Sequence, residues 1–433
     1  MRNYLQKRIV NNAFSVSELA KIYQFPSYKQ TNQVIMIPSF GGGIYGTIEN
    51  NILINGDVQK YWALQGIPDM SMSTVYVYNS EIMDFTDETS TLENIMDISV
   101  VGSCCQCIII LCLFPNNISF LEAFTTMING ITINGSTFYP SIISMSWGMP
   151  ETDADILDLT QTNSLLKRTN INVCVAAGDN GSSDGKSTLT VDYPASSPYV
   201  TAVGGTSLIC PNIFYDSSTN ETVWNDGTTA TGGGISIFFS KPTYQTFLPG
   251  TYRNVPDLAF NADPNTGIQL YFNGQIQYGI GGTSMCAPLF AAYLALVTIP
   301  NTILSFINPL LYSNTCFHDI TIGSNSIGYR GQYYAKTGYD NCTGLGSLIG
   351  NKLVNPYIKL PQSMTIRKGF IYHIPIQTNL NVVWSSSNKN VLVHQNGFIL
   401  GMNIGTAIIT ARANNLSVST TVTVQNPKTL ILY

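Results

Sequence analysis

The sequence predicts an α/β domain, with a parallel sheet and helices on both faces, followed by a small all-β sandwich. Short apolar runs alternate with helical patterns up to about residue 355, and several of these runs end in Gly, Ser or Asp. Strands that alternate with helices form largely parallel sheets. After Pro356 the helical patterns stop and short alternating strands begin. We therefore expect two domains, residues 1–356 and 357–433.

Four apolar segments predict strands of the parallel sheet: residues 34–38, 142–148, 173–179 and 200–206. The stretches between them have helical patterns, for example from Ile156 to Lys167. The most apolar run, residues 104–114 (CCQCIIILCLF), is shorter than the ~20 residues of a membrane span and predicts a buried strand. Because parallel sheets bind ligands at the carboxyl ends of their strands, we expect the functional residues there.

Composition and charge argue against several classes of function. The net charge is −5 and no stripe of Lys or Arg is present, so nucleic-acid binding has little support. The basic start is not followed by an apolar segment, so no secretory signal is predicted. Nine cysteines, an odd number, lack the second cluster of a zinc site. We interpret them as free buried thiols, and one or two disulfides involving Cys210, Cys316 or Cys342 are the alternative.

The segment Gly282–Pro288 (GTSMCAP) predicts a nucleophilic serine, Ser284, at the start of a buried helix. In subtilisin-type sites a histidine earlier in the chain removes the serine proton. All three histidines of this chain, His318, His373 and His394, follow Ser284. An Asp-His-Ser site is therefore disfavoured, and a carboxylate is the candidate base.

Glu93 and Asp97 are the candidate carboxylates, because residues four apart share one face of a helix. Two adjacent carboxyl groups oppose each other's ionisation, which raises one pKa and makes the glutamate a better proton acceptor. Most such pairs belong to a solvated helix face. The apolar neighbours Ile95, Met96 and Ile98 predict a partly buried helix instead.

Asp179 follows a strongly apolar strand and enters a Gly/Ser-rich loop. It either closes an Asx-turn or, in its protonated form, donates a hydrogen bond to an oxyanion beside the backbone N–H of Ser284. The second role requires a neutral carboxyl group. It therefore predicts activity at acidic pH and loss of activity towards neutrality.

Residues 1 to about 355 resemble the sedolisins, the serine-carboxyl peptidases. The matching motifs run in the family's order: residues 37–43, 93–98, 144–148, 176–181, 193–206, 233–236, 256–259 and 282–284. The resemblance implies a subtilisin-like fold and an acid-acting endopeptidase, with a tripeptidyl peptidase as the alternative. It also implies Ser284 as nucleophile, Glu93 as general base, Asp97 as its partner and Asp179 as the oxyanion acid.

The same resemblance implies one structural calcium ion. Two carboxylates and several backbone carbonyls form a hard oxygen site, which suits Ca2+. The implied ligands are the side chains of Asp319 and Asp340 and the carbonyls of Ile320, Lys336 and Gly338. Lys336 stands where the family usually has glycine, and we interpret His318 as a structural neighbour of this loop.

A protein or peptide substrate is expected to lie extended along residues 144–148 and 233–236, where backbone pairing gives affinity. Trp147 either lines a pocket there or belongs to the core. Sedolisins usually carry an N-terminal propeptide, and this chain begins almost at the mature domain. A separate chain is one possible source of the prosegment or of an inhibitor. We expect an acidic or extracellular compartment, a virion included.

The tail, residues 357–433, resembles the bacterial immunoglobulin-like group 2 module in residues 384–388, 397–399 and 405–407. That resemblance implies a small immunoglobulin-like β-sandwich without catalytic residues, which acts as a spacer or binds a surface partner. The rival to an enzyme is thus a non-catalytic binding protein that uses this tail. The four filled catalytic positions argue against it.

Overall fold

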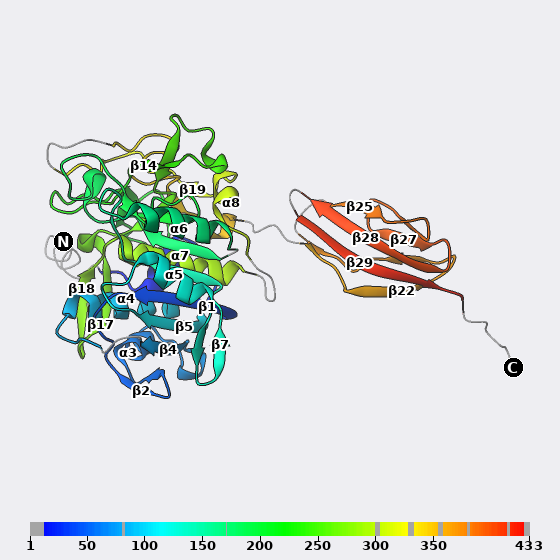
Figure 1. The fold of residues 1–433 in the computed structure, drawn as a ribbon, viewed down its shortest axis with the longest axis horizontal. Coiled ribbons are helices and arrows are strands. Elements are labelled where there is room, and N and C mark those ends of the chain that lie inside the picture. The colour runs from blue at the N-terminus through cyan, green and yellow to red at the C-terminus, as the bar shows by residue number, and fades with distance from the viewer. Residues whose placement is uncertain are drawn as a thin grey trace. The chain divides into compact units, whose positions relative to one another are not determined.

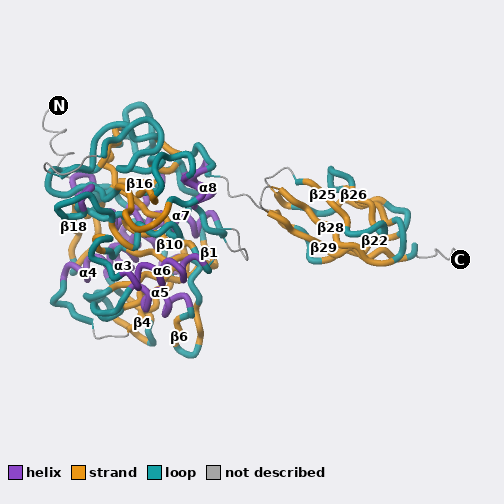
Figure 2. The backbone as a smooth tube through the Cα atoms, turned by 45° about the horizontal axis from the view of Figure 1, so that its top comes forward, coloured by secondary structure: helices purple, strands orange, loops and turns teal. Residues whose placement is uncertain are grey.

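The computed structural model describes residues 13–79, 83–169, 171–298, 304–327, 333–353, 358–378, 382–413 and 416–427. The chain forms two compact units, residues 1–353 and 354–433. Within the described residues, the first unit combines helices and strands, whereas the second contains strands and no helix (Figures 1 and 2).

A twelve-stranded sheet forms the centre of the first unit. Across the sheet the order is β19 (Phe317–His318), β20 (Ser347–Leu348), β16 (Leu258–Asn261), β12 (Thr201–Ile209), β10 (Asn172–Ala176), β8 (Ile142–Met145), β1 (Gln30–Ser39), β5 (Gln106–Leu113), β4 (Thr74–Asn79), β3 (Ile52–Ile54) and β2 (Thr47–Glu49), with β13 (Asn220–Val223) paired to β12. Neighbouring strands from β16 to β4 are all parallel. The predicted parallel sheet is therefore confirmed.

Helices bury their apolar sides on both faces of this sheet. One core contains residues of α2 (Val16–Ile22), α3 (Asp57–Leu64), α4 (Glu88–Cys104) and α7 (Thr283–Val297), and the other contains residues of α5 (Phe120–Ile128) and α6 (Ile156–Lys167). In β1, Ile35 and Ile37 belong to the first core and Met36 to the second. This alternation is typical of a strand that is buried on both faces.

Shorter elements lie around the sheet. They are α8 (Asn308–Tyr312), β6 (Ile131–Ile133), β7 (Ser136–Phe138), β9 (Met149–Pro150), β11 (Asp192–Tyr193), β14 (Gly234–Ser240), β15 (Tyr252–Val255), β17 (Ile268–Phe272), β18 (Gln275–Ile280) and the 3-10 turns Asp69–Ser71, Gly181–Ser183, Thr243–Gln245, Pro264–Thr266 and Gly350–Lys352. No helix in the described ranges has the length and apolar character needed to cross a bilayer.

The apolar run at residues 104–114 differs in detail from the prediction. Its strand is β5, whereas Cys104 ends α4 and Cys105 caps that helix. The boundary was hard to predict because helix and strand meet without an intervening glycine or proline. All nine cysteines lie in described segments and are buried and unpaired, so the interpretation as free thiols is confirmed.

The second unit is built from small sheets. One has the order β22 (Ser363–Arg367), β29 (Leu416–Gln425), β28 (Gly405–Ala413) and β25 (Val383–Ser386), a second has β23 (Ile371–His373), β27 (Phe398–Gly401) and β26 (Val391–Val393), and β21 (Ile358–Lys359) pairs with β24 (Gln377–Thr378). Trp384, Ile409 and Val422 are buried in a core of its own.

Candidate active site

The first turn of α7 holds Ser284 and depends on a glycine. Gly282 caps the helix with a φ of 97°, a left-handed conformation that favours glycine. A Cβ atom at this position would lie 2.7 Å from Oδ2 of Asp179. Glycine therefore permits both the turn and the close approach of Asp179 to the start of the serine helix.

Helix α4 carries Glu93 and Asp97 and packs against α7. Its first turn is fixed to the glycine loop after β1. The amide of Asn94 donates to the carbonyl oxygens of Gly41 and Gly43 over 3.2 and 3.0 Å, and the Gly43 N–H donates to Oγ1 of Thr91 over 3.0 Å. The glycine turn predicted after residues 34–38 thus fixes the helix that bears both carboxyl groups.

Ser146, in the loop after β8, connects the two helices. Its hydroxyl lies 2.9 Å from Oδ1 of Asp97 and 3.1 Å from the carbonyl oxygen of Ser284, and its single proton can be donated to either oxygen. The Ser284 hydroxyl lies 3.4 Å from the carbonyl oxygen of Ser146. Sequence reasoning placed Ser146 only on the substrate edge. Its position at the carboxyl end of a central strand is the sequence feature that could have indicated a role in the site.

The Glu93 carboxyl group is close enough to the hydroxyls of Ser284 and Ser146 for hydrogen bonding. Burial is the main cause that raises the pKa of Glu93, and the charge of Asp179 adds to it, while Ser284 and Ser146 partly offset the increase. Burial and the charge of Glu93 raise the pKa of Asp97. Oε1 of Glu93 is buried without a hydrogen-bond donor among the described residues. It is therefore available to accept a proton.

Asp179 is held by the first residue of α7. Its Oδ1 accepts hydrogen bonds from the backbone N–H and the hydroxyl of Thr283, over 2.8 and 2.7 Å. Burial raises its pKa, and the bonds from Thr283 partly oppose that change. Because Oδ1 is used as an acceptor, Oδ2 is the oxygen that can carry a proton. Asp179 is thus tied to the serine helix instead of closing an Asx-turn in its own loop.

Two further buried carboxyl groups lie beside Asp179, and sequence reasoning missed both. Asp192 borders Gly148 and Gly178, and Asp184 also approaches Gly178. Oδ1 of Asp192 and Oδ2 of Asp184 are buried without a hydrogen-bond partner among the described residues. Burial raises the pKa of each group. Only the folded loop brings these residues together, so no spacing in the sequence predicted them.

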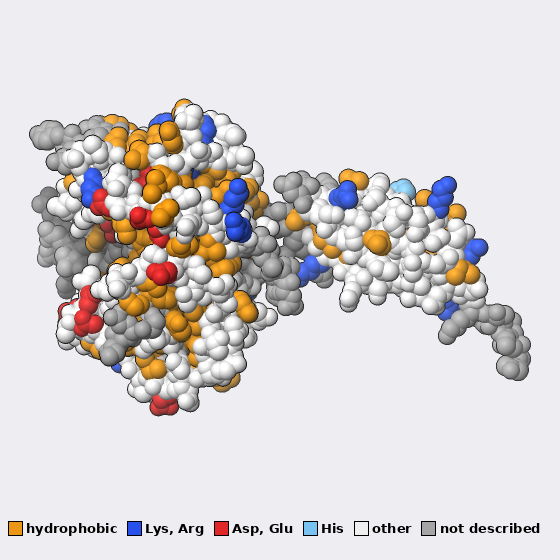
Figure 3. All heavy atoms as spheres, viewed as in Figure 1, with side chains coloured by type: hydrophobic (Ala, Val, Ile, Leu, Met, Phe, Trp, Pro, Cys, Tyr) orange, Lys and Arg blue, Asp and Glu red, His pale blue; other side chains and the backbone are white. Residues whose placement is uncertain are grey.

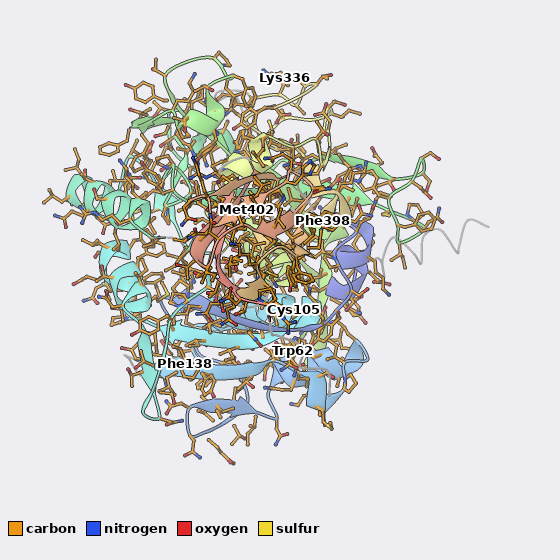
Figure 4. All side chains as sticks on the ribbon, turned by 90° about the vertical axis from the view of Figure 1, so that its right-hand side faces the viewer. Trp62, Cys105, Phe138, Lys336, Phe398 and Met402 are labelled. Carbon is orange, nitrogen blue, oxygen red and sulfur yellow. The ribbon has the colours of Figure 1, made fainter. Side chains whose placement is uncertain are left out.

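The predicted ion ligands lie in two neighbouring loops. Oδ2 of Asp319 accepts from the N–H of Gly338 over 3.0 Å, and Asp340 accepts from the N–H groups of Cys342 and Thr343, each over 2.8 Å. Lys336 is exposed at the outer margin of the first unit (Figure 4). In the described ranges no three His, Cys, Asp or Glu side chains form a metal cluster.

Two residues with open interpretations are now placed. Trp147 is partly buried against the second core, with its ring 5.8 Å from that of Phe40. The His318 ring stacks on Tyr215 at 3.4 Å, next to the loop of Asp319. Burial lowers the pKa of His318 to about 4.

The chain is similar to known peptidases. The subtilase family model matches residues 122–305. Kumamolisin from Bacillus sp. (strain MN-32) is 36% identical over 366 residues, which cover 79% of this chain and 63% of that protein. Sedolisin from Pseudomonas sp. (strain 101) is 31% identical over 351 residues, which cover 73% and 56%. The structure of Pseudomonas sedolisin, a serine-carboxyl proteinase complexed with pseudo-iodotyrostatin, matches with a TM-score of 0.67 and 28% identity, and covers 79% of this chain and 97% of that one.

The parallel sheet and the serine at the start of a buried helix place the first unit in the subtilase class of folds. Within that class, the first unit is similar to kumamolisin and to sedolisin, a serine-carboxyl proteinase. The predicted subtilisin-like fold of this unit is therefore confirmed. The chain spans about three-fifths of the length of kumamolisin and of sedolisin.

Proposed function

We propose that the chain is an acid-acting serine-carboxyl endopeptidase. The observation that carries this proposal is the bridge by Ser146, which joins Asp97 to the backbone of Ser284. Asp179 contacts the start of the same helix. A hydroxyl nucleophile, a pair of acids and a third acid therefore converge at one strand end, and no imidazole is needed.

The proposed first step starts from the fraction of molecules in which Glu93 is ionised and Asp179 is protonated. In that form Ser284 Oγ attacks the scissile carbonyl carbon while its proton moves to the Glu93 carboxylate. The electron pair of the carbonyl moves to its oxygen. Protonated Asp179, through Oδ2, and the Ser284 backbone N–H donate to that oxyanion. Asp97 accepts the Ser146 hydroxyl and stabilises protonated Glu93.

In the following steps, Glu93 returns its proton to the amine nitrogen and the carbon–nitrogen bond breaks, which leaves an ester on Ser284. Water then gives a proton to Glu93 and its oxygen attacks the ester carbon. The tetrahedral adduct collapses, Ser284 Oγ recovers the proton, and the carboxylic acid is released.

We infer that Asp184 and Asp192 bind one side chain of the substrate. Both carboxyl groups have a buried oxygen without a partner among the described residues, and both lie next to the Asp179 loop. A cationic side chain would supply the missing donors. A peptide with Arg before the scissile bond is therefore expected to be cleaved faster than its Ala analogue, and equal kcat/KM values would argue against this pocket.

The peptidase proposal is tested by hydrolysis of an unfolded protein near pH 4. The intact chain is expected to cleave it, whereas Ser284→Ala and Glu93→Gln should each lose at least roughly a thousandfold in kcat. Equal cleavage by the intact chain and Ser284→Ala would overturn the proposal in favour of a binding protein. An N-terminally blocked peptide and its free-amine twin separate endopeptidase from tripeptidyl peptidase action, because only the second requires a free amine.

We further propose one structural Ca2+ ion in the loops of Asp319 and Asp340. The donor set supports it, since two carboxylates and the carbonyls of Ile320, Lys336 and Gly338 are hard oxygen ligands. Bound Ca2+ would hold the two loops together. A chelator is expected to lower the melting temperature of the first unit and added Ca2+ to restore it. An unchanged melting temperature would contradict the site.

We also propose that residues 357–433 form an immunoglobulin-like module. It is supported by antiparallel strand pairs in two sheets, β25 with β28 and β26 with β27, whose buried residues share one core with Trp384. The proposed acid chemistry of the first unit fits an acidic or extracellular compartment. We also propose that a separate chain can bind the peptidase unit as its prosegment or as an inhibitor.

A further inference from the structure

Charge is divided unequally between the two units. Residues 354–433 contain six Lys or Arg and no Asp or Glu, so the other 353 residues hold fourteen Lys or Arg against twenty-five Asp or Glu. The exposed cations of the second unit include Arg367, Lys368, Lys389 and Arg412. On the face drawn in Figure 3 this unit shows blue Lys and Arg side chains and no red ones. Its surface therefore attracts anions.

One sheet of the second unit presents a polar outer face. Ile366, Ala407 and Val422 point into its core, so the alternate residues point outward. These outward residues are mostly hydroxyl-bearing: Ser363, Thr365, Ser385, Thr406, Thr410, Ser417, Ser419, Thr421 and Thr423. The Thr410 and Ser419 hydroxyls are 2.8 Å apart across the sheet. We call these residues, with Arg367 and Arg412, the hydroxyl face.

A guanidinium group marks each end of the hydroxyl face. Arg367 pairs with Gln425 at the end of β29, and Arg412 pairs with Ser417 near its start. Eight residues of strand separate these positions, which is roughly 27 Å at about 3.4 Å per residue. Val383 and Ile408 add exposed apolar surface between the polar groups. Described strands of this face contribute no outward aromatic side chain.

We propose that the hydroxyl face binds an acidic polysaccharide. Rows of Ser and Thr hydroxyls both donate and accept, as sugar hydroxyls do, and Arg pairs with the carboxylate or sulfate of such a chain in a bidentate manner. Nucleic acid fits less well, because its binding relies on dense phosphate contacts and stacking on aromatic side chains. The unit has no Asp or Glu side chain to repel the polymer, and Lys and Arg keep their charge from pH 4 to 7.

The test uses the full chain with Ser284→Ala, heparin beads as the acidic polysaccharide and dextran beads as the neutral one, at pH 5 and low salt. Retention on heparin and not on dextran is expected. The double variant Arg367→Gln/Arg412→Gln should bind heparin roughly tenfold or more weakly. The matched control is Lys359→Gln/Lys389→Gln, which removes the same charge outside the hydroxyl face and should change the affinity less than about threefold.

Three results would overturn the proposal. They are no retention on heparin, equal weakening by the two double variants, or tighter binding of duplex DNA than of heparin in competition. Equal weakening would mean that heparin binds through the overall positive charge of the unit and not through the hydroxyl face. Preference for DNA would mean that the unit binds nucleic acid. Unchanged melting temperatures of both double variants exclude misfolding as the cause of weak binding.

Discussion

At the residue scale, Ser146 is proposed to position the catalytic groups without reacting itself, and substitution of Ser146 tests this role. Its hydroxyl lies within hydrogen-bond distance of Asp97 and of the Ser284 carbonyl. Because a buried acceptor that loses its donor costs about 1–3 kcal/mol, Ser146→Ala is expected to lower kcat roughly ten- to a hundredfold and to leave KM nearly unchanged. Steady-state kinetics on a soluble peptide measure both constants.

The matched control for Ser146 is Ser144→Ala in the same motif. The Ser144 hydroxyl is buried and has no hydrogen-bond partner within the described residues. Its loss should therefore change kcat less than about threefold. If both variants lose the same activity, general disturbance of the strand end explains the effect and the positioning role is wrong.

Asp179 sets the alkaline limit of activity in this mechanism. Because burial raises its pKa, the carboxyl group stays protonated above the usual range and loses its donor proton as the pH rises further. Asp179→Asn keeps a donor at every pH, so its pH–rate profile should lose the alkaline decline that the intact chain shows. Asp179→Ala removes the donor and should cost roughly a hundred- to a thousandfold in kcat. An alkaline limb that stays in place in Asp179→Asn would assign it to another group.

The sequence alone was sufficient to place residues whose position depends on local spacing. Glu93 and Asp97 fall on one helix, and Ser284 falls at the start of another, as predicted. The sequence could not reveal Ser146, Asp184 or Asp192 as neighbours of these groups. Their contacts arise where separate strand ends meet, and no local pattern records which loops meet.

At the element scale, α4 requires a glycine where it crosses α3. A Cβ atom at Gly102 would overlap the indole of Trp62, whose Nε1 donates to the Ser99 carbonyl over 3.0 Å. Gly102→Ala is therefore expected to lower the free energy of unfolding of the first unit by about 1–3 kcal/mol, because overpacking displaces a buried ring. Chemical denaturation measures this change.

The control within α4 is Thr89→Ala, since Thr89 is exposed in the first turn. This substitution should change the free energy of unfolding by less than about 0.5 kcal/mol. A stability of Gly102→Ala equal to that of Thr89→Ala would show that the indole moves aside without cost.

The elements themselves were predicted well where periodicity and length agree. Helix α6 spans Ile156–Lys167 as expected, and residues 34–38 lie within β1. The junction at Cys104 and Cys105 was misplaced because apolar residues continue from the buried helix into the buried strand. Hydrophobicity reports burial, and both elements are buried there.

At the scale of the whole molecule, the two units differ in their response to pH. Burial raises the pKa of eight carboxyl groups in the first unit: Glu93, Asp97, Glu151, Asp179, Asp184, Asp192, Glu221 and Asp340. The second unit has no Asp or Glu side chain. Only the first unit can therefore gain stability from buried acids that stay protonated.

The sign of this effect follows from proton uptake. The unfolded chain releases these protons near pH 4, whereas the folded unit keeps them to higher pH, so the stabilisation is complete below about pH 4 and is lost as the pH rises through the raised values. Calorimetry of the Ser284→Ala chain should show the first unit melting at lower temperature at pH 7.5 than at pH 4. The transition of the second unit should move little and serves as an internal control. A first-unit melting temperature that rises over this range would show that the buried carboxyl groups are ionised in the folded state, and acid activation would then lack its physical basis.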